Sequence, residues 1–510
     1  MELLTWSLAV IISLLGFFYM HITKNRGYWK KRGVKEIEYA FPFGSIKDRF
    51  LMRKSFHEFY AEMCYKYYGE PYIGFYEGSR PVLMIQDPDI LRSVMSSNFD
   101  HFVDRGAPIV NKYPHIAKMM LILNGKEWKQ VRSIVAPAFS TGKIRKMLDT
   151  IELSSQDLKQ YITKIIKENG GESTGPINVP ETMRKFTLDV IASTAFGVTC
   201  KSFENESSEF SNKIANFHNI SNIARMVIIL IISLEVPNII TNLLPVSLFN
   251  HDTVTYLAKV VKETTKYRLD NNMRRNDFLQ LLMDAQNISS GEEDENQTGD
   301  GISEDTAIAQ SVLFLVAGYE TSSTLLTMAC YELAQNLQIQ EKLRSEIKVK
   351  LESASGKLSY DDLNDLPYLD MVLAETLRLY PPIGRAERIC TKPIKLGDLY
   401  IEKNLKMCVS IVGIHMNPDY YPEPKVFKPE RFSDEEKAKR HTYVYLPFGH
   451  GPRQCIGSRF AQMTVKLCLA HIISNFNINI CEKTKIPFEY DKKSIFLKSS
   501  TGIYLQFSHN

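Results

Sequence analysis

The chain begins with a long apolar stretch. Leu3 to Thr23 contains no charged residue and is rich in Leu, Ile, Val and Phe. As a helix rising about 1.5 Å per residue, such a stretch can cross a hydrocarbon layer of about 30 Å. The residues that follow are basic with no acid among them: Lys24, Arg26, Lys30, Lys31, Arg32 and Lys35. Because positive flanks stay in the cytosol, we expect a transmembrane anchor over residues 3–23 and a basic stop-transfer and hinge segment over residues 24–44.

A cleaved signal peptide is the competing interpretation of this stretch. It would begin with basic residues and end at a small-residue cleavage site. The chain instead begins with Met1-Glu2, and no such site follows the apolar run. The pattern therefore favours an uncleaved, single-pass anchor with a lumenal N-terminus and the rest of the chain in the cytosol.

The rest of the chain has a mainly helical pattern. Helical periodicity dominates from about residue 87 to residue 350, and no second linker or internal repeat interrupts it. Strand-like runs lie near residues 72–76, 81–86, 394–401, 407–412 and 502–507. We therefore predict one mainly α (α+β) domain over residues 45–510.

Two segments depart from this pattern. Met226 to Leu234 is almost wholly apolar but too short to span a bilayer, so it is either a buried helix or a surface that dips into the membrane. Ser289 to Asp305 is acidic and contains glycine, which predicts a solvated loop between two helices.

Composition narrows the class of protein. The 510 residues are 44% hydrophobic and 24% charged, which excludes a disordered or polytopic membrane protein. The net charge of +4 is too small to suggest nucleic-acid binding. Eight cysteines are too few for a disulfide scaffold of this length.

One cysteine stands in a distinctive context. Residues 446–457 read Leu-Pro-Phe-Gly-His-Gly-Pro-Arg-Gln-Cys-Ile-Gly, and a helical pattern follows. Cys455 thus ends a tight glycine-rich loop at a helix N-terminus, where backbone N–H groups and the helix dipole favour a thiolate. A thiolate in a rigid loop suits an iron ligand, and Phe448 would shield one side.

Other interpretations of Cys455 are weaker. Most isolated cysteines are structural, and glycines beside one are weak evidence alone. A zinc or iron–sulfur site would need a partner cysteine two or four residues away, and none is present. A nucleophilic thiol would need a paired histidine, and the sequence proximity of His450 does not establish one.

The segment Phe448 to Gly457 resembles the haem-binding signature of the cytochrome P450 family. Four further motifs resemble those of the family: Trp128 with Arg132, Ala317 to Thr321, Glu375 to Arg378, and Pro429 to Phe432. The similarity runs from about Phe41 to the C-terminus and is nearest to the insect detoxification and vertebrate drug-metabolising branch. The hinge departs from the family pattern, because Pro42 stands there without the usual further prolines.

The resemblance implies the cytochrome P450 fold. This is a helical bundle around haem with small β-sheets, preceded in microsomal members by an N-terminal transmembrane helix. The implied location is the endoplasmic reticulum membrane, with the catalytic domain in the cytosol. The implied cofactor is haem b, with Cys455 as the iron ligand.

The oxygen side of the site is expected on the central helix. Phe314, Ala317, Gly318 and Thr321 fall on one face of a helix, and the small Ala317 and Gly318 would let that face approach a flat haem. Thr321 offers a hydroxyl and Glu320 a nearby acid for proton delivery, so we expect these two as catalytic residues.

The remaining site residues follow from the resemblance. Cationic partners of the haem propionates are expected at Arg132, Arg388 and Arg453, with Arg105 weaker and Trp128 contributing its indole N–H. Glu375, Arg378 and Arg431 are expected as a structural triad behind the cysteine loop. The residues expected to line an apolar substrate pocket are Phe102, Ile109, Met119, Met120, Phe314, Ala317, Ile383 and Thr501.

Electrons must come from a second protein. No glycine-rich dinucleotide fingerprint opens a βαβ unit, so the chain lacks its own nicotinamide or flavin site. The resemblance implies NADPH–cytochrome P450 reductase, with cytochrome b5 as an additional partner. One set of basic residues has two interpretations: a docking face for the reductase, or an ordinary solvated surface. The set is Lys126, Lys129, Lys143, Arg145, Lys146, Lys437, Lys439 and Arg440.

The leading hypothesis is a membrane-anchored haem-thiolate monooxygenase acting on lipophilic small molecules: xenobiotics, or endogenous steroids, fatty acids or hormones. One alternative is a haem-thiolate isomerase or dehydratase acting on peroxides. Glu320-Thr321 argues against it, because such enzymes need no proton delivery. Another alternative is a non-catalytic haem sensor or carrier.

Overall fold

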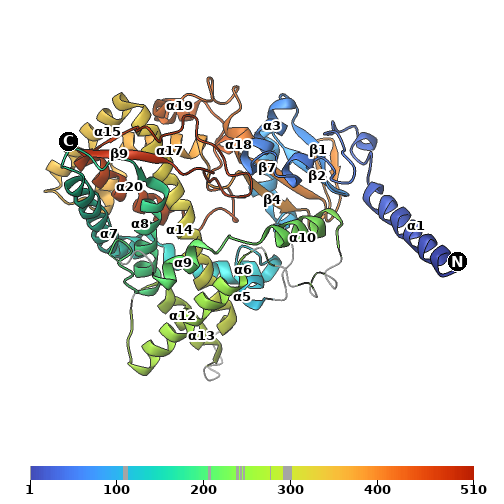
Figure 1. The fold of residues 1–510 in the computed structure, drawn as a ribbon, viewed down its shortest axis with the longest axis horizontal. Coiled ribbons are helices and arrows are strands. Elements are labelled where there is room, and N and C mark those ends of the chain that lie inside the picture. Colours follow the sequence, from blue (N-terminus) through green and yellow to red (C-terminus); the bar gives the residue numbers. More distant parts are fainter. Residues whose placement is uncertain are drawn as a thin grey trace.

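A computed structural model describes residues 2–106, 113–204, 208–236, 241, 244, 247, 249–275, 277–290 and 301–510. Ile109 and the middle of the acidic segment, residues 291–300, lie outside the described residues. Within them the chain forms a helical body with a smaller sheet-rich region, and the N-terminal helix extends away from both (Figure 1). The prediction of a mainly α fold with small sheets is confirmed.

Helices supply most of the structure. Those of the N-terminal half are α1 (Glu2–Thr23), α2 (Lys47–Phe50), α3 (Phe56–Lys66), α4 (Pro88–Arg92), α5 (Pro114–Ala117), α6 (Gly125–Val135), α7 (Thr141–Glu168), α8 (Val179–Phe196), α9 (Glu209–Ala215), α10 (Asn222–Ser233) and α12 (His251–Asp270). Those that follow are α13 (Phe278–Ser290), α14 (Glu304–Gln335), α15 (Leu337–Ser353), α16 (Tyr360–Asn364), α17 (Pro367–Leu379), α18 (Ile411–His415), α19 (Asp434–Ala438) and α20 (Ser458–Asn475).

The strands form three small sheets. Their bounds are β1 (Tyr72–Glu77), β2 (Arg80–Ile85), β3 (Ile177–Asn178), β4 (Arg385–Ile389), β5 (Ile394–Leu396), β6 (Leu399–Ile401), β7 (Lys406–Ser410), β8 (Phe476–Asn479) and β9 (Tyr504–His509). The largest sheet has the order β1-β2-β7-β4, in which β2 and β7 are parallel and the other pairs antiparallel. The others have the orders β3-β9-β8 and β5-β6.

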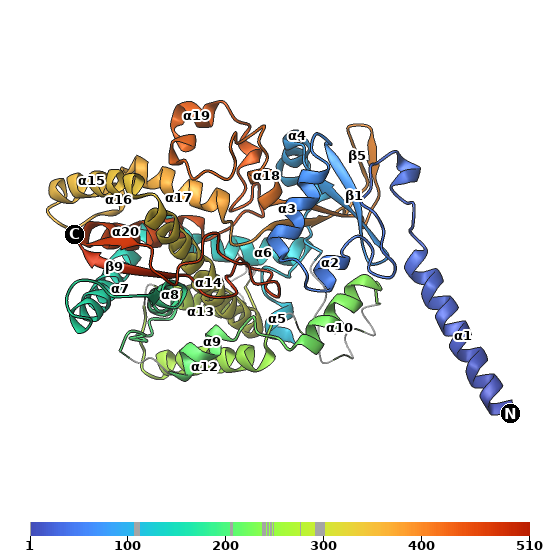
Figure 2. The same ribbon diagram turned by 45° about the horizontal axis from the view of Figure 1, so that its top comes forward.

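The long helix α14 is the centre of the helical body. Ser303 caps its N-terminus by accepting a hydrogen bond from the backbone N–H of Thr306. The helix packs along α8, and the Thr187 hydroxyl of α8 donates to the Tyr319 carbonyl of α14 at 2.9 Å. Its neighbours in the main apolar core also include α17 and α20 (Figure 2). This packing holds the predicted oxygen-side residues on a rigid element.

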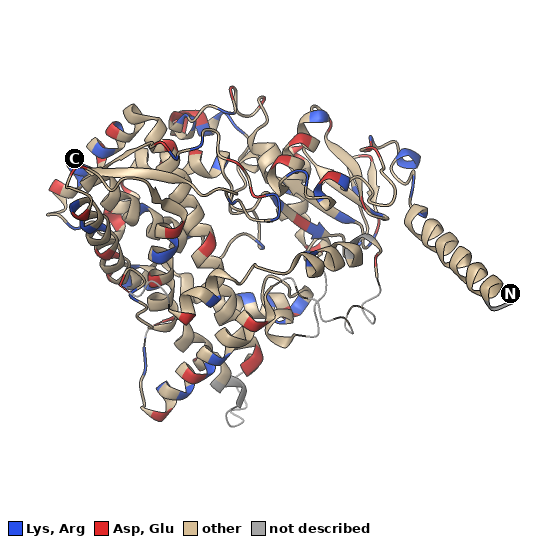
Figure 3. Cartoon of the chain, viewed as in Figure 1, with Lys and Arg blue, Asp and Glu red and all other residues tan. Residues whose placement is uncertain are grey.

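The N-terminal helix differs from every other helix. The side chains from Leu4 to Met20 are exposed, and Figure 3 shows the helix free of charge along most of its length up to its basic flank. By length and hydropathy it could span a membrane. The helix α14 passes the same test, but most of it is buried in the core.

The segment after the anchor packs on the sheet. The Trp29 side chain is fully buried, and its indole N–H donates to the Phe75 carbonyl at 3.1 Å. Lys24 forms an ion pair with Glu235 at 2.6 Å, just beyond α10. The Trp29 ring therefore belongs to the apolar core of the sheet region.

The structure refines several strand predictions. The run 394–401 is a hairpin of β5 and β6 whose turn contains Gly397 with φ of +59°. The run 407–412 splits, because the Ser410 hydroxyl accepts the N–H of Gly413 and begins α18. The sequence of β4 is polar and does not predict a strand. The segment is extended because it pairs with β7.

Candidate functional site

The cysteine loop is held by its own backbone. Gly449 and Gly451 have φ of +69° and +73°, a region that side chains disfavour. A Cβ on Gly451 would lie 1.8 Å from the Met95 carbonyl oxygen, so the loop also packs closely on a neighbouring segment. The Cys455 N–H donates to the Phe448 carbonyl at 2.8 Å. These constraints give Cys455 a fixed position before α20.

The Cys455 thiol is accessible although protein surrounds it. Burial raises the pKa of the Cys455 thiol, while the Gly457 N–H and the guanidinium groups of Arg105 and Arg132 lower it. The net shift of the pKa is upward in the chain without a bound metal ion, and the expected thiolate at Cys455 stays a prediction. Desolvation outweighs the backbone N–H groups, and a bound metal ion would supply the missing stabilisation.

Four arginines form a cluster beside the cysteine loop, and two of them, Arg105 and Arg132, act on the thiol. Arg388 and Arg453 are buried, and Arg105 and Arg132 are partly buried. Burial, followed by the charge of Arg105, lowers the pKa of Arg388 to about 9. Burial lowers the pKa of Arg453 to about 8, and the charges of Arg105, Arg388 and Arg132 add to the effect, opposed by Asp104. The cluster therefore holds several cations against few negative charges.

Hydrogen bonds satisfy only part of this cluster. Arg453 donates to the carbonyls of Val103 (2.9 Å) and Leu123 (2.7 Å), and its guanidinium lies 4.0 Å from the centre of the Trp128 ring. Arg105 donates to the Arg453 carbonyl at 2.7 Å.

Arg388 differs from the other three in having a buried guanidinium nitrogen that lacks a partner in the described part of the chain. Its Nη1 donates to the Glu387 carbonyl at 2.8 Å, but its buried Nε has no partner among the described residues. A buried, unpartnered cation is costly unless an anion joins it. Arg105, Arg132, Arg388 and Arg453 thus fit a ligand that carries carboxylates, such as a haem with two propionates, and Cys455 fits its iron.

The helix α14 presents one accessible stripe in its buried central part. Between Ala307 and Ala334 the residues that are not buried are Leu313, Ala317, Gly318, Glu320, Thr321 and Thr324. Apart from Gly318, their spacing of three or four places them on one helical face. The Thr321 hydroxyl donates to the Ala317 carbonyl at 2.7 Å.

Gly318 does not serve the role expected of it. A Cβ at this position would lie 2.8 Å from Cδ1 of Ile191 on α8. The absence of a side chain therefore allows α8 and α14 to pack closely. The expectation that Gly318 makes room for a haem is wrong.

Glu320 has a partner that the sequence did not suggest. Its carboxylate lies 3.5 Å from Nε of Arg184 on α8. The two residues are far apart in the chain, so no local pattern could have joined them. His218 also lies near Glu320, and burial lowers the pKa of this histidine to about 4. The proton-delivery pair predicted on α14 thus belongs to a wider polar group.

The predicted triad is assembled as expected. Glu375 and Arg378 are fully buried and joined by two contacts of 2.7 Å, and Arg431 lies 3.3 Å from the Glu375 carboxylate. Arg378 also donates to the carbonyls of His415 and Pro424. The group ties α17 to the segment that precedes the cysteine loop.

The predicted pocket residues within the described part of the chain separate into three groups by exposure. Ala317, Ile383 and Thr501 are exposed, and Ile383 pairs through its backbone with Phe496. Met120 and Phe314 retain little accessible surface. Phe102 and Met119 have none and pack in two different apolar cores, which corrects their assignment as lining residues. Phe448 is partly buried and packs against the main core.

Comparison with known proteins agrees with this geometry. A family model for cytochrome P450 matches residues 41–507. Cytochrome P450 6k1 of Blattella germanica is 33% identical over 98% of this chain and 96% of its own. Cytochrome P450 3A18 of Rattus norvegicus is 35% identical over 96% and 95% of the two chains. Lithocholate 6-beta-hydroxylase of Mesocricetus auratus is 34% identical over 98% and 96%. The chain belongs to the cytochrome P450 family, and it is a P450 monooxygenase.

Proposed function

We propose that this chain inserts one oxygen atom of O2 into lipophilic small molecules, using electrons from NADPH delivered by a reductase. The observation that carries the proposal is an accessible Cys455 thiol beside uncompensated arginines, together with an accessible stripe on α14 that bears Thr321. The first feature suits a haem-thiolate, and the second suits proton delivery to bound oxygen.

The proposed cofactor is haem b. Cys455 would bind its iron, and Arg105, Arg132, Arg388 and Arg453 would receive its propionates, with the Trp128 indole beside them. When bound, the haem supplies the activation of oxygen. Phe448 and Ala317 would contact the haem through their apolar side chains.

The proposed task of the α14 residues is proton delivery. The Thr321 hydroxyl can exchange its hydrogen bond to the Ala317 carbonyl for one to a ligand. Glu320 can then pass a proton from solvent towards the Thr321 oxygen, and Arg184 holds the carboxylate in place between transfers. A peroxide isomerase would need none of these steps, so their loss would leave its activity intact.

The proposed substrates are apolar. Ala317, Ile383 and Thr501 offer accessible surface with little charge. A similar protein from Mesocricetus auratus is named for hydroxylating lithocholate, a steroid acid. We propose steroids, fatty acids, hormones or xenobiotics as the substrate class.

The proposed location is the endoplasmic reticulum membrane. Residues 3–23 would form a single-pass anchor, residues 24–44 a hinge that packs on the sheet, and residues 45–510 the cytosolic catalytic domain. On α10 the side chains of Ile223, Met226 and Leu230 are exposed, which favours a surface that dips into the membrane. The ion pair between Lys24 and Glu235 joins the end of the anchor to the end of α10, which supports a place for α10 on the membrane-facing side of the catalytic domain.

We propose α6 and the start of α7 as the docking face for the reductase, which cytochrome b5 would share. Lys126, Lys129 and Lys146 are exposed and have no ion pair among the described residues. In contrast, Arg145 pairs with Asp361, Lys437 with Asp434 and Lys439 with Glu436. The docking face is therefore narrower than the basic set predicted from sequence.

Changing Lys126 and Lys129 to Gln tests the docking face. The rate of haem reduction by the reductase should fall several-fold at low salt and little at high salt, because salt screens exposed charges. Stopped-flow reduction measures it, with Lys437→Gln as the matched control at a paired lysine. An unchanged rate at low salt would exclude this face.

One experiment tests the proposed function. The full-length protein, reductase and NADPH are incubated with a panel of apolar compounds, and hydroxylated product is compared with NADPH consumed. Thr321→Ala should reduce product per NADPH by about 10- to 100-fold, while Thr321→Ser should retain it, because a positioned proton donor contributes about 100-fold or more.

The reduced carbon monoxide complex should show the spectrum of thiolate-ligated haem, and Cys455→Ala should lose it. Product from a peroxide without NADPH would favour the isomerase instead.

A further inference from the structure

His415 is the last residue of α18 and lies in the core between α17 and the start of the cysteine loop. Its side chain has no accessible surface. One ring nitrogen, Nδ1, lies 3.0 Å from the Arg378 carbonyl oxygen. The other, Nε2, accepts the backbone N–H of Leu446 at 2.8 Å. The ring therefore joins two segments that are distant in the chain.

These two contacts define the state of the ring. The Leu446 N–H is a donor, so Nε2 must carry a lone pair, and the proton must be on Nδ1, where it is donated to the Arg378 carbonyl. Burial lowers the pKa of His415 to about 3, and the charge of Arg378 adds to the shift. A neutral imidazole that donates at one edge and accepts at the other meets both demands at once.

The Leu446 end leads directly to the cysteine. The Leu446 carbonyl accepts the N–H of Gly449 at 3.0 Å, and the Phe448 carbonyl accepts the N–H of Cys455 at 2.8 Å. Leu446 is therefore the residue at which the loop leaves the core. The Tyr445 ring stacks on the His415 ring with centroids 5.6 Å apart and planes inclined by 19°.

The Arg378 end leads to the buried triad. Arg378 is bound by Glu375, and its Nη1 donates to the His415 carbonyl at 2.9 Å. His415 thus contacts Arg378 through both its side chain and its backbone. The triad fixes the imidazole on one side, and the imidazole fixes the loop on the other.

We infer that His415 is a positioning residue for the thiolate ligand: through Leu446 it sets where the cysteine loop begins relative to α17, and so keeps Cys455 on the iron. The inference rests on the proposed haem-thiolate site. Within the described residues, the hydrogen bonds of the His415 ring go to the Arg378 carbonyl and the Leu446 N–H and to none of the proposed haem-binding side chains, so its effect passes through the backbone of the loop.

Three substitutions separate the two edges of the ring. In His415→Gln the side-chain carbonyl can take the place of Nε2 and accept the Leu446 N–H. In His415→Asn the shorter amide can take the place of Nδ1 and donate to Arg378 but cannot reach Leu446. His415→Phe keeps a ring beside Tyr445 and offers neither bond. All three substitutions therefore remove the imidazole, but only His415→Gln keeps a hydrogen bond to the Leu446 N–H.

The readout is the spectrum of the reduced carbon monoxide complex of the full-length protein over time at raised temperature. His415→Asn and His415→Phe should lose the thiolate signature about 10-fold faster than wild type, because an unsatisfied buried N–H destabilises the loop. His415→Gln should stay within about twofold of wild type, because its bond to Leu446 remains. Melting temperatures of the haem-free chains should fall by similar amounts in His415→Gln and His415→Asn, because each loses one of the two buried hydrogen bonds, whereas their rates of thiolate loss should differ.

Two results would overturn the inference: equal loss rates in His415→Gln and His415→Asn, or loss rates that follow the melting temperatures. A second measurement needs no variant, should one fail to fold. In the haem-free wild type the Leu446 amide should exchange hydrogen as slowly as the Cys455 amide, and rapid exchange at Leu446 would also overturn it. If the wild-type protein shows no thiolate signature but its Leu446 amide exchanges slowly, the proposed haem-thiolate function is refuted. The hydrogen bond between His415 and Leu446 is then still supported.

Discussion

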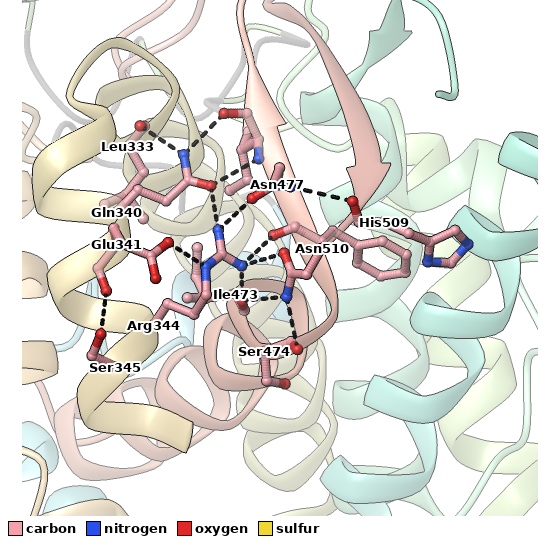
Figure 4. Close-up of polar contacts among 12 residues, drawn as sticks. Leu333, Gln340, Glu341, Arg344, Ser345, Ile473, Ser474, Asn477, His509 and Asn510 are labelled. Atoms are coloured by element: carbon pink, nitrogen blue, oxygen red, sulfur yellow. Dashed lines mark hydrogen bonds and ion pairs between the residues drawn. The ribbon is translucent and has the colours of Figure 1, made fainter. Parts of the chain in front are cut away.

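Two buried arginines illustrate how structural and ligand-binding cations differ in this molecule. Arg344 on α15 and Arg388 on β4 have 3% and 5% of their surface accessible. Arg344 donates to the carbonyls of Ile473 and Phe476 and to the side chains of Gln340 and Asn477 (Figure 4). Its Nε lies 2.9 Å from the Glu341 carboxylate, so all of its nitrogens have partners.

Arg388 has the opposite environment. One nitrogen donates to a neighbouring carbonyl, Nε has no partner among the described residues, and the nearest charge that affects its pKa is another cation, Arg105. Arg344 is complete within the chain, whereas Arg388 lacks an anion. Since buried charge is stable only when paired, the incomplete cluster indicates a ligand and the complete one indicates a fold contact.

Removing the complete arginine should have the largest effect on stability. Arg344→Met would remove the side-chain donor of the Phe476 carbonyl and of the Asn477 amide oxygen. It would also remove one of the two donors of the Ile473 carbonyl and of the Gln340 amide oxygen. We expect the free energy of unfolding to fall by about 3–4 kcal/mol, because buried acceptors lose their partners. Denaturant unfolding of the haem-free chain measures it.

The control is Lys348→Met, at an exposed position on the same helix, which should change stability little. Haem affinity per folded molecule should be unchanged in Arg344→Met. A variant that unfolds normally but binds haem poorly would contradict the assignment of Arg344 to the fold.

Removing the incomplete arginine should give the reverse pattern. Arg388→Gln should weaken haem binding by about 10- to 100-fold, because a charge-assisted bond to a propionate contributes about 1.5–3 kcal/mol. The melting temperature of the haem-free chain should be unchanged or higher, because an uncompensated buried charge is removed. Haem titration and thermal unfolding of the same samples measure the two quantities.

Arg92→Gln, which breaks a surface ion pair with Asp89, is the matched control and should leave both quantities unchanged. If Arg388→Gln destabilised the haem-free chain and left haem affinity intact, Arg388 would be a fold contact like Arg344.

The sequence predicted these two regions unequally. Arg388, the cysteine loop and the Glu375–Arg378 pair lie within or beside short motifs, so local pattern and family resemblance suffice to find them. Apart from Gln340 and Glu341 on its own helix, the partners of Arg344 lie about 130 residues later in the chain, at the end of α20 and on β8, and no local signal joins them. The fold class followed from helical periodicity, which depends only on neighbours in the chain.

The same distinction explains the errors at the site. Gly318 was expected to face the haem because it shares a face with Ala317, but tertiary packing on Ile191 accounts for it. The pairing of Glu320 with Arg184 depends on how α8 lies against α14. Phe102 was assigned to the pocket by its segment, yet its side chain faces the sheet region. Orientation within a segment requires the fold.

Buried histidines are a third kind of buried polar group, because their hydrogen bonds are formed by the neutral imidazole. Acidification should therefore lower the free energy of unfolding. Burial lowers the pKa of His57 to about 4, and its Nε2–H donates to the Pro381 carbonyl at 2.9 Å. His415 and His218 are lowered to about 3 and about 4 by the same cause. Between these values and the ordinary 6.5, the unfolded chain binds protons that the folded chain does not, so stability falls as pH falls from about 6.5 to 5, by about 1.4 kcal/mol per pH unit for each histidine at most. His57→Gln keeps a donor for Pro381 and should make this slope shallower in denaturant unfolding of the haem-free chain. If the dependence of unfolding free energy on pH did not change, His57 would be protonated in the folded chain. Its buried site would then tolerate a positive charge, as the sites of Arg388 and Arg453 do.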